Sequence, residues 1–194
     1  MYEAIPFTLE TVIGGKTNKI RLVPFQAEDQ QRLIDNVDCP ETLYLWAGKT
    51  FSYPLTHSQL DSYRAAGEGQ NPEKILFTAV NTVDNSPFGH VEISDIAPAL
   101  SARIARVFIV DKNQRGRGLG AALVKTTAEF AFLKLGVDRV DLGFNKENLA
   151  AERCYQKLGF KPVGFWENAI QIDDFTIDVQ WMTLFRKELT SHQI

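Results

Sequence analysis

Apolar positions recur along the chain with two periods, and these periods predict a mixture of strands and helices. Alternating or continuous runs of β-branched and aromatic residues predict strands, whereas apolar residues spaced three or four apart predict helices with one buried face. In the middle of the chain the strands follow one another directly, which favours an antiparallel meander over regular β–α–β alternation. We expect strands at 7–13, 19–23, 75–80, 88–93, 100–110, 139–144, 160–165 and 179–184, and helices at 27–37, 56–66, 119–136 and 148–159.

Length and composition are those of an ordinary globular domain. The chain has 194 residues, of which 44% are hydrophobic and 23% are charged, and we expect one domain across residues 1–194. The formal net charge of −3 gives no reason to expect a nucleic acid or an anionic membrane as partner. The N-terminus lacks the basic start and apolar run of a signal peptide, and no apolar run approaches the roughly 18 residues of a membrane span. Cys39 and Cys154 have neither metal-ligand spacing nor disulfide density. We therefore expect a cytoplasmic protein without a metal, either a monomer or a homodimer.

A glycine-rich loop lies between a predicted strand and a predicted helix, at residues 111–120. Glycines on alternate positions let the backbone bend sharply and approach a ligand closely, because there is no Cβ in the way. The first turn of the following helix leaves backbone N–H groups unpaired at the positive end of the helix dipole. The loop therefore predicts an anion site that suits a pyrophosphate. Its glycines are Gly116, Gly118 and Gly120, and its cations are Lys112, Arg115 and Arg117.

Two known phosphate-binding motifs explain this loop poorly. The Gly-Lys-Thr triplets at Gly15 and Gly48 lack the earlier glycine that a Walker A loop needs. The pattern Gly116-x-Gly118-x-x-Ala121 does match the dinucleotide fingerprint, and acidic residues follow about 20 positions later. Those acidic residues do not stand at the end of a strand, where the ribose contact requires one. The dinucleotide interpretation therefore accounts for the loop alone.

A third interpretation uses two motifs in sequence order. The pattern Arg115-x-x-Gly118-x-Gly120 resembles the acyl-CoA loop of the GNAT acetyltransferase family. After the next predicted strand, Asn148-x-x-Ala-x-x-x-Tyr155-x-Lys-x-Gly-Phe160 resembles the second half of that domain. The resemblance spans about residues 20–189 and is specific over 107–160. It implies the fold of that family, α+β (α/β), with a mixed, twisted and mostly antiparallel sheet of about seven strands that is covered by helices and split beside the loop strand.

The resemblance also implies acetyl-CoA as co-substrate and assigns its contacts. The loop backbone is expected to hold the pyrophosphate, and the strand before it is expected to pair with the pantetheine arm and to hold the thioester oxygen. Asn148 is expected to bond the cofactor, although capping of a helix would explain it as well. The expected cofactor-binding residues are Phe108, Ile109, Val110, Arg115, Gly116, Arg117, Gly118, Leu119, Gly120 and Asn148.

Two residues are candidates for proton transfer. Most of an alkyl amine is protonated at neutral pH and must lose a proton before it attacks a thioester. Glu92 is the candidate base, because its side chain points away from the sheet face of Val91 and Ile93 and the family places a glutamate on the equivalent strand. The competing interpretation is a solvated carboxylate, and Asp95 is a weaker substitute. Tyr155 matches the family's tyrosine that protonates the leaving thiolate, with core packing as the competing interpretation.

An aromatic cluster around Gly48 supplies the candidate acceptor-binding residues Trp46, Phe51 and Tyr53. The segment resembles, loosely, acetyltransferases of ribosomal-protein N-termini and polyamines; packing beneath two short helices explains it nearly as well. The predicted function is an acetyl-CoA-dependent N-acetyltransferase that acts on a small-molecule amine or a protein N-terminus by direct attack. A non-catalytic acyl-CoA sensor is the alternative, and a dinucleotide-binding protein is a more distant one.

Overall fold

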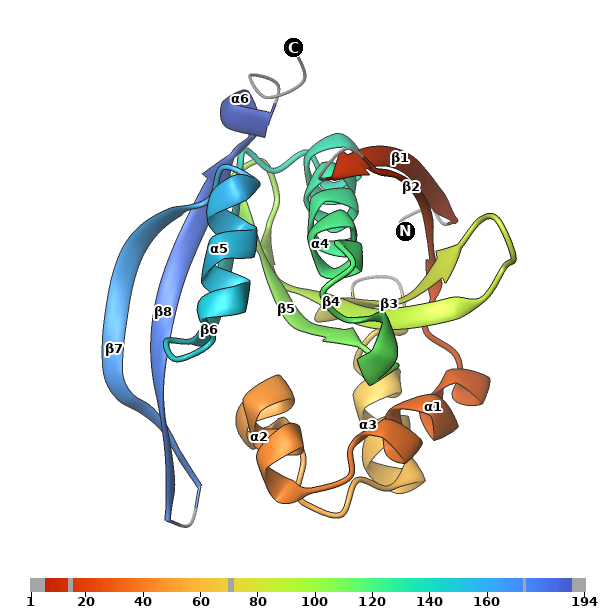
Figure 1. Ribbon diagram of the computed structural model, residues 1–194, viewed down its shortest axis with the longest axis vertical. Coiled ribbons are helices and arrows are strands. Elements are labelled where there is room, and N and C mark those ends of the chain that lie inside the picture. The colour runs from red at the N-terminus through yellow and green to blue at the C-terminus, as the bar shows by residue number, and fades with distance from the viewer. Residues whose placement is uncertain (1–5, 14–15, 70–71, 173, 190–194) are drawn as a thin grey trace.

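The computed structural model describes residues 6–13, 16–69, 72–172 and 174–189, and its centre is one eight-stranded sheet (Figure 1). The strand order is β1-β2-β3-β4-β5-β6-β8-β7, and β5 and β6 form the parallel pair of an otherwise antiparallel sheet. The predicted mixed, mostly antiparallel sheet is therefore confirmed, with eight strands in place of about seven. The expected turn at Gly14 and Gly15 lies outside the described residues. The strands are β1 (Phe7–Ile13), β2 (Lys16–Pro24), β3 (Lys74–Asn81), β4 (Pro87–Ala97), β5 (Ser101–Ile109), β6 (Arg139–Asn145), β7 (Lys161–Ile172) and β8 (Phe175–Phe185).

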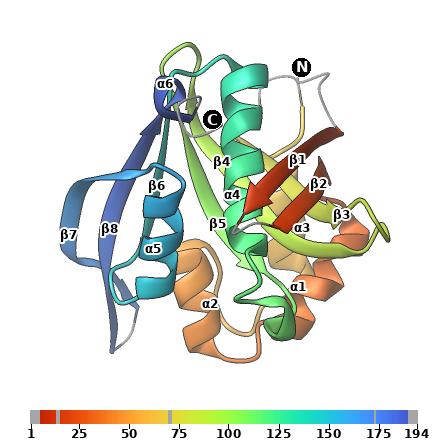
Figure 2. The same cartoon turned by 45° about the horizontal axis from the view of Figure 1, so that its top comes forward.

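Helices cover both faces of the sheet (Figures 1 and 2). Helix α4 packs against β1, β2, β4 and β5, and the larger hydrophobic core lies between this helix and the sheet. Three short helices near the N-terminus enclose a smaller core on the opposite face. Thr56 is the N-cap of one of these helices, since its hydroxyl accepts a hydrogen bond from the Gln59 N–H at 3.4 Å. The helices are η1 (Ala27–Asp29), α1 (Gln30–Asn36), α2 (Pro40–Ala47), η2 (Gly48–Thr50), α3 (His57–Ala65), η3 (Lys112–Gln114), α4 (Leu119–Phe130), η4 (Ala131–Leu135), α5 (Leu149–Lys157) and α6 (Arg186–Leu189).

The sheet divides where β5 and β6 separate. Their pairing covers Ser101 to Arg103 of β5 and no further. Three residues later Arg106 adopts a φ of +50°, a backbone conformation that residues other than glycine rarely take. Around Arg106, two residues of β5 oppose Val91 of β4, which is the geometry of a β-bulge. The bulge bends β5 away from β6, and α2 lies beside the resulting opening (Figure 1).

The strands of the C-terminal hairpin are longer than predicted. The sequence predicts strands at 160–165 and 179–184, whereas β7 and β8 extend to Ile172 and from Phe175. Their distal part is paired in the hairpin but mostly exposed, so its side chains have no burial pattern that a sequence could reveal. Among the described residues, no helix is long and apolar enough to cross a membrane.

Candidate active site

Three cavities follow one another along the separation of β5 and β6. The first, which we call the loop cavity, has a volume of about 520 Å³ and is lined by the glycine loop, α4 and α5. The second, the junction cavity, has about 380 Å³ and shares Val107, Asn148 and Tyr155 with the first. The third, the aromatic cavity, has about 290 Å³ and shares Trp46 and Arg106 with the second. A continuous series of cavities thus runs from the glycine loop to the inner side of the C-terminal hairpin.

The glycine loop has the geometry of an anion cradle. Gly116 and Gly118 adopt φ angles of +74° and +88°, which glycine takes without strain, and Gly118 is the N-cap of α4. The Ala122 N–H donates to the Gly118 carbonyl at 3.0 Å and closes the first turn. The N–H groups of the residues between them therefore precede the hydrogen-bond ladder of the helix. A Cβ added at Gly116 would meet no atom within 4 Å, so the space beside this backbone is open.

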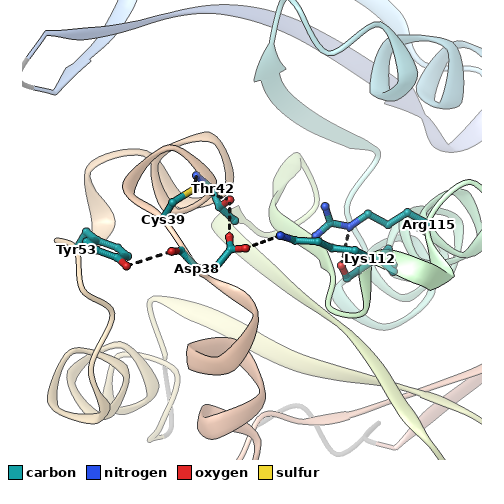
Figure 3. Close-up of polar contacts among 7 residues, drawn as sticks. Asp38, Cys39, Thr42, Tyr53, Lys112 and Arg115 are labelled. Carbon is teal, nitrogen blue, oxygen red and sulfur yellow. Dashed lines mark hydrogen bonds and ion pairs between the residues drawn. The ribbon is translucent and has the colours of Figure 1, made fainter.

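The loop cations have partners of their own (Figure 3). The Lys112 Nζ forms an ion pair with the Asp38 carboxylate at 2.6 Å. The Arg115 Nε donates to the Ile109 carbonyl at 3.1 Å, and its guanidinium lies 5.3 Å from the centre of the Phe108 ring. Arg117 is exposed. Because two of the three charges are already engaged, backbone N–H groups are the main feature of this loop that could bind an anion.

Strand β5 turns an unpaired edge toward the cavities. The Val110 N–H donates to the Phe88 carbonyl of β4 at 3.0 Å, and the Val110 side chain is buried in the smaller core. Since N–H groups alternate in direction along a strand, those of Val107 and Ile109 point away from β4. The structure therefore places Val107 and Ile109, but not Val110, where a ligand strand could pair. Phe108 is 6% exposed and packs in the smaller core against Trp46, with ring centres 5.0 Å apart.

Asn148 and Tyr155 meet at the boundary between the loop and junction cavities. The Asn148 side chain accepts a hydrogen bond from the Ala151 N–H at 3.0 Å, so the residue both caps α5 and lines the cavities. The Tyr155 ring lies edge-on to Phe144, with centroids 5.3 Å apart. Burial raises the pKa of the Tyr155 hydroxyl far above its usual value, so the group carries its proton at neutral pH. Tyr155 thus packs against the core and lines the site at once.

Glu92 points away from the larger core, as predicted, but solvent does not reach it. Its side chain is 1% exposed, and its Oε1 atom forms an ion pair with the Nη1 atom of Arg106 at 2.6 Å. Val91 and Ile93 are buried in the larger core on the other face. The interpretation of Glu92 as a solvated carboxylate is therefore wrong. Arg106, which lines the junction and aromatic cavities, stands between Glu92 and an occupant of the site.

A buried histidine extends this polar cluster. The Tyr63 hydroxyl and the His90 Nε2 atom are 3.0 Å apart, and His90 is 1% exposed. Burial, helped by the Arg106 charge, lowers the pKa of His90 from 6.5 to about 3, so the imidazole is neutral at physiological pH. Burial and the nearby Glu92 carboxylate hold the pKa of Tyr63 well above its usual value. Glu92 and Arg106 are therefore the charged members of a cluster whose other two groups are neutral.

The three predicted acceptor-binding aromatics have separate places. Trp46 lines the junction and aromatic cavities, and its Nε1 donates to the Arg106 carbonyl at 3.0 Å. Phe51 is 6% exposed and stacks on Trp46 in the smaller core. The Tyr53 hydroxyl donates to the Asp38 carbonyl at 3.1 Å, beside the N-terminal end of α2 (Figure 3). Of the three, Trp46 is brought to the cavities, and packing accounts for Phe51.

Other residues that line the cavities carry no signal in the sequence. Trp166 and Trp181 reach the aromatic cavity because the β7–β8 hairpin continues the sheet beyond β6. Arg103 and Arg106 are three residues apart, so the alternation of a regular strand would place them on opposite faces. The positive φ of Arg106 and the bulge around it, which the neighbouring residues do not reveal, bring both to one cavity. Within the described part of the chain, no group of three or more histidine, cysteine, aspartate or glutamate residues could hold a metal ion.

Comparison with known proteins agrees with this arrangement. Residues 41–160 match the family model described as the acetyltransferase (GNAT) family. An uncharacterized N-acetyltransferase of Bacillus subtilis strain 168, YobR, is 31% identical over 101 residues, which are 52% of this chain and 38% of that protein. A mycothiol acetyltransferase of Salinispora tropica is 45% identical over 64 residues, 31% of this chain and 20% of that protein. The chain therefore spans less than half the length of these two relatives.

Solved structures share the fold at low sequence identity. The spermidine N-acetyltransferase of Vibrio cholerae, in complex with CoA and spermine, superimposes with a TM-score of 0.75. The sequence identity is 17%, and the match covers 88% of this chain and 98% of that one. At this identity the likeness concerns the fold alone.

Proposed function

Because the chain belongs to the acetyltransferase (GNAT) family, we propose that it is an acetyl-CoA-dependent N-acetyltransferase that acts on a primary amine by direct attack. The observation that carries this proposal is the continuity of the three cavities. The loop cavity suits a pyrophosphate, the aromatic cavity is separate from it, and the junction cavity connects them beside Tyr155. A thioester and an amine that enter from opposite ends would therefore meet at this tyrosine.

The residues of the loop and of β5 fit acetyl-CoA as co-substrate. Backbone N–H groups at the start of α4 bind the pyrophosphate, in the open space beside Gly116 and Gly120. The N–H groups of Val107 and Ile109 bind the amide-rich arm along the free edge of β5, and one of them polarises the thioester carbonyl. Arg115 and Arg117 add charge at the rim, where solvent screens them. Asn148 orients the arm from the opposite side.

Tyr155 is the proposed proton donor. The amine nitrogen forms a bond to the acetyl carbon, the carbon–sulfur bond breaks, and the leaving thiolate takes the proton of the Tyr155 hydroxyl. The hydroxyl is protonated at neutral pH, and the phenolate that the transfer leaves, which burial disfavours, regains through water the proton that the amine releases. The structure describes no protein hydrogen bond to this hydroxyl, so it is free to turn toward the sulfur. The amine, for its part, loses a proton to water or to a base.

The sequence suggests Glu92 as the general base, but its surroundings favour an indirect role. Both of its carboxylate oxygens are buried, and an arginine cannot relay a proton because it stays protonated. Direct proton acceptance would require Arg106 to move aside. We therefore propose that Glu92 is a positioning residue, which fixes the Arg106 guanidinium at the wall of the acceptor site. General-base catalysis through a water remains the hypothesis that a pH–rate profile distinguishes from it.

Calorimetry and a thiol-release assay test the proposed function. The protein should bind acetyl-CoA and show no measurable heat with NAD, and free thiol should appear when a primary amine is added. Binding of acetyl-CoA without turnover of any amine would favour the sensor hypothesis. Binding of NAD in place of acetyl-CoA would contradict the assignment of the loop. Because a structural neighbour is named for spermidine, small primary amines are the first panel.

A further inference from the structure

The aromatic cavity has an unusual charge pattern for a site that receives an amine. Its walls combine aromatic and aliphatic side chains, among them Tyr44, Trp166 and Trp181. The charged residues along it, within the described part of the chain, are Arg103 and Arg106, and none is an aspartate or a glutamate. A site for a polycation would need carboxylates to offset the loss of water around each positive charge.

The carboxylates that partner the two arginines lie outside the cavity lining. Arg103 Nε is 3.1 Å from the Asp95 carboxylate, and Arg106 Nη1 is 2.6 Å from Glu92. Neither acid lines the aromatic or the junction cavity. The charges nearest an occupant are therefore positive, and their counter-charges lie behind them. The junction cavity has a single lining carboxylate, the exposed Glu147.

We infer, on the basis of the proposed function, that the acceptor is a monoamine attached to an aromatic or other large apolar group and has no second positive charge. The indole and phenol rings supply apolar surface for the body of such a molecule. Aromatic rings can also attract a cation, but here the two guanidinium groups oppose a second one. The pattern thus favours an acceptor class different from the polyamines.

The same charges assist the chemistry of the amine. A positive neighbour disfavours the protonated form of a bound amine and lowers the pKa of that amine. Arg106, which lines both the aromatic and the junction cavity, is the nearest such neighbour on the way to Tyr155. The bound acceptor therefore gives up its proton more readily than it does in water, and no carboxylate needs to face it.

The test uses two matched pairs of amines in a thiol-release assay with saturating acetyl-CoA. Hexylamine and 1,6-diaminohexane differ by the second amine, and 2-phenylethylamine and ethylamine differ by the ring. We expect kcat/KM to be at least about tenfold higher for hexylamine than for the diamine, and for 2-phenylethylamine than for ethylamine; tenfold corresponds to about 1.4 kcal/mol. Spermidine should be a poorer substrate than either monoamine with a large apolar group.

Two variants test whether the arginine charges cause the preference for hexylamine over the diamine. Arg103→Met removes one of the two charges, and the ratio of hexylamine to diamine should fall at least about threefold, about 0.7 kcal/mol. Arg139→Met is the control, because this arginine lies on β6 with Asp141 as partner and lines neither cavity. The wild-type ratios still test the inference if Arg103→Met does not fold.

The outcomes separate the inference from the proposed function. A preference for spermidine or for the diamine would overturn the acceptor class and leave the acetyltransferase function standing. A hexylamine-to-diamine ratio that Arg103→Met and Arg139→Met leave equally unchanged would overturn the assignment to the arginines. Thiol release with none of the amines would overturn the proposed function, and this inference with it.

Discussion

Substitution of Glu92 by glutamine is expected to destabilise the protein strongly, because it leaves the Arg106 charge without its partner. The two side chains are 1% and 14% exposed, so the pair belongs to the buried class. Removal of one member of a buried ion pair costs about 3–5 kcal/mol of unfolding free energy. For a chain of this length, that loss lowers the melting temperature by about 6–20 °C.

Asp95→Asn is a matched control for this substitution on the same strand. It breaks the ion pair with Arg103, whose members are 32% and 67% exposed. An exposed pair of this kind contributes about 1 kcal/mol or less. Glu92→Gln should therefore cost several times as much as Asp95→Asn in urea denaturation at neutral pH. The double variant Glu92→Gln/Arg106→Gln removes both charges and should recover part of the loss.

Kinetics then distinguish the two roles of Glu92. If Glu92 positions Arg106, Glu92→Gln and Arg106→Gln should affect the KM of the amine alike and leave the shape of the pH–rate profile unchanged. If Glu92 is a general base, kcat/KM should fall by roughly 10²–10⁴-fold, and the residual rate should rise with pH. A stability loss for Glu92→Gln no larger than that for Asp95→Asn would refute the argument from burial.

Four further substitutions test the site and the buried cluster. Gly120→Val should preserve the fold, because an added Cβ meets only Ile109 Cγ1 at 3.9 Å, yet it should weaken acetyl-CoA binding at least about tenfold in calorimetry. Arg117→Ala removes an exposed charge and should weaken binding less. Equal losses of affinity in the two variants would contradict binding by the loop backbone. Tyr155→Phe keeps the ring packing and should lower kcat without changing the affinity for acetyl-CoA. A wild-type kcat in this variant would show that Tyr155 serves packing alone. His90 makes the free energy of unfolding depend on pH. As the pH falls from 6.5 toward 3, this histidine is protonated in the unfolded chain but stays neutral in the folded chain, so the free energy of unfolding decreases by up to about 5 kcal/mol. Urea denaturation from pH 7 to 4 should therefore show a shallower decline in His90→Gln than in the wild type, and parallel declines would rule out this histidine.

Local signals in the sequence were sufficient to predict much of the fold. The β-branched run before Asp111, the alternate glycines and the apolar spacing after Leu119 predicted a strand, a loop and a helix, and the structure has β5, the loop and α4 at these places. Each of these features depends on neighbours within a few residues. The alternation that placed Glu92 opposite Val91 and Ile93 was equally reliable, because the side-chain period of a strand is fixed by its geometry.

Tertiary structure decided what each candidate residue faces. A sequence shows that Glu92 leaves the larger core, but the second layer of helices on that face, and Arg106 from the neighbouring strand, determine that it is buried and paired. In the same way, Tyr53 binds the Asp38 carbonyl and Phe51 packs in the smaller core, whereas Trp46 reaches the cavities.

The sequence by itself thus determined the order of the elements, the glycine loop and the two motifs that carry the family resemblance, because these are properties of short segments. The aromatic cavity, which is the proposed acceptor site, was decided by the tertiary structure alone. Its walls come from α2, β5, β6 and the C-terminal hairpin, so Tyr44, Arg103 and Trp181 meet across more than a hundred residues of chain. The physical reason is the bulge at Arg106, which separates β5 from β6 and opens the space that these distant segments line.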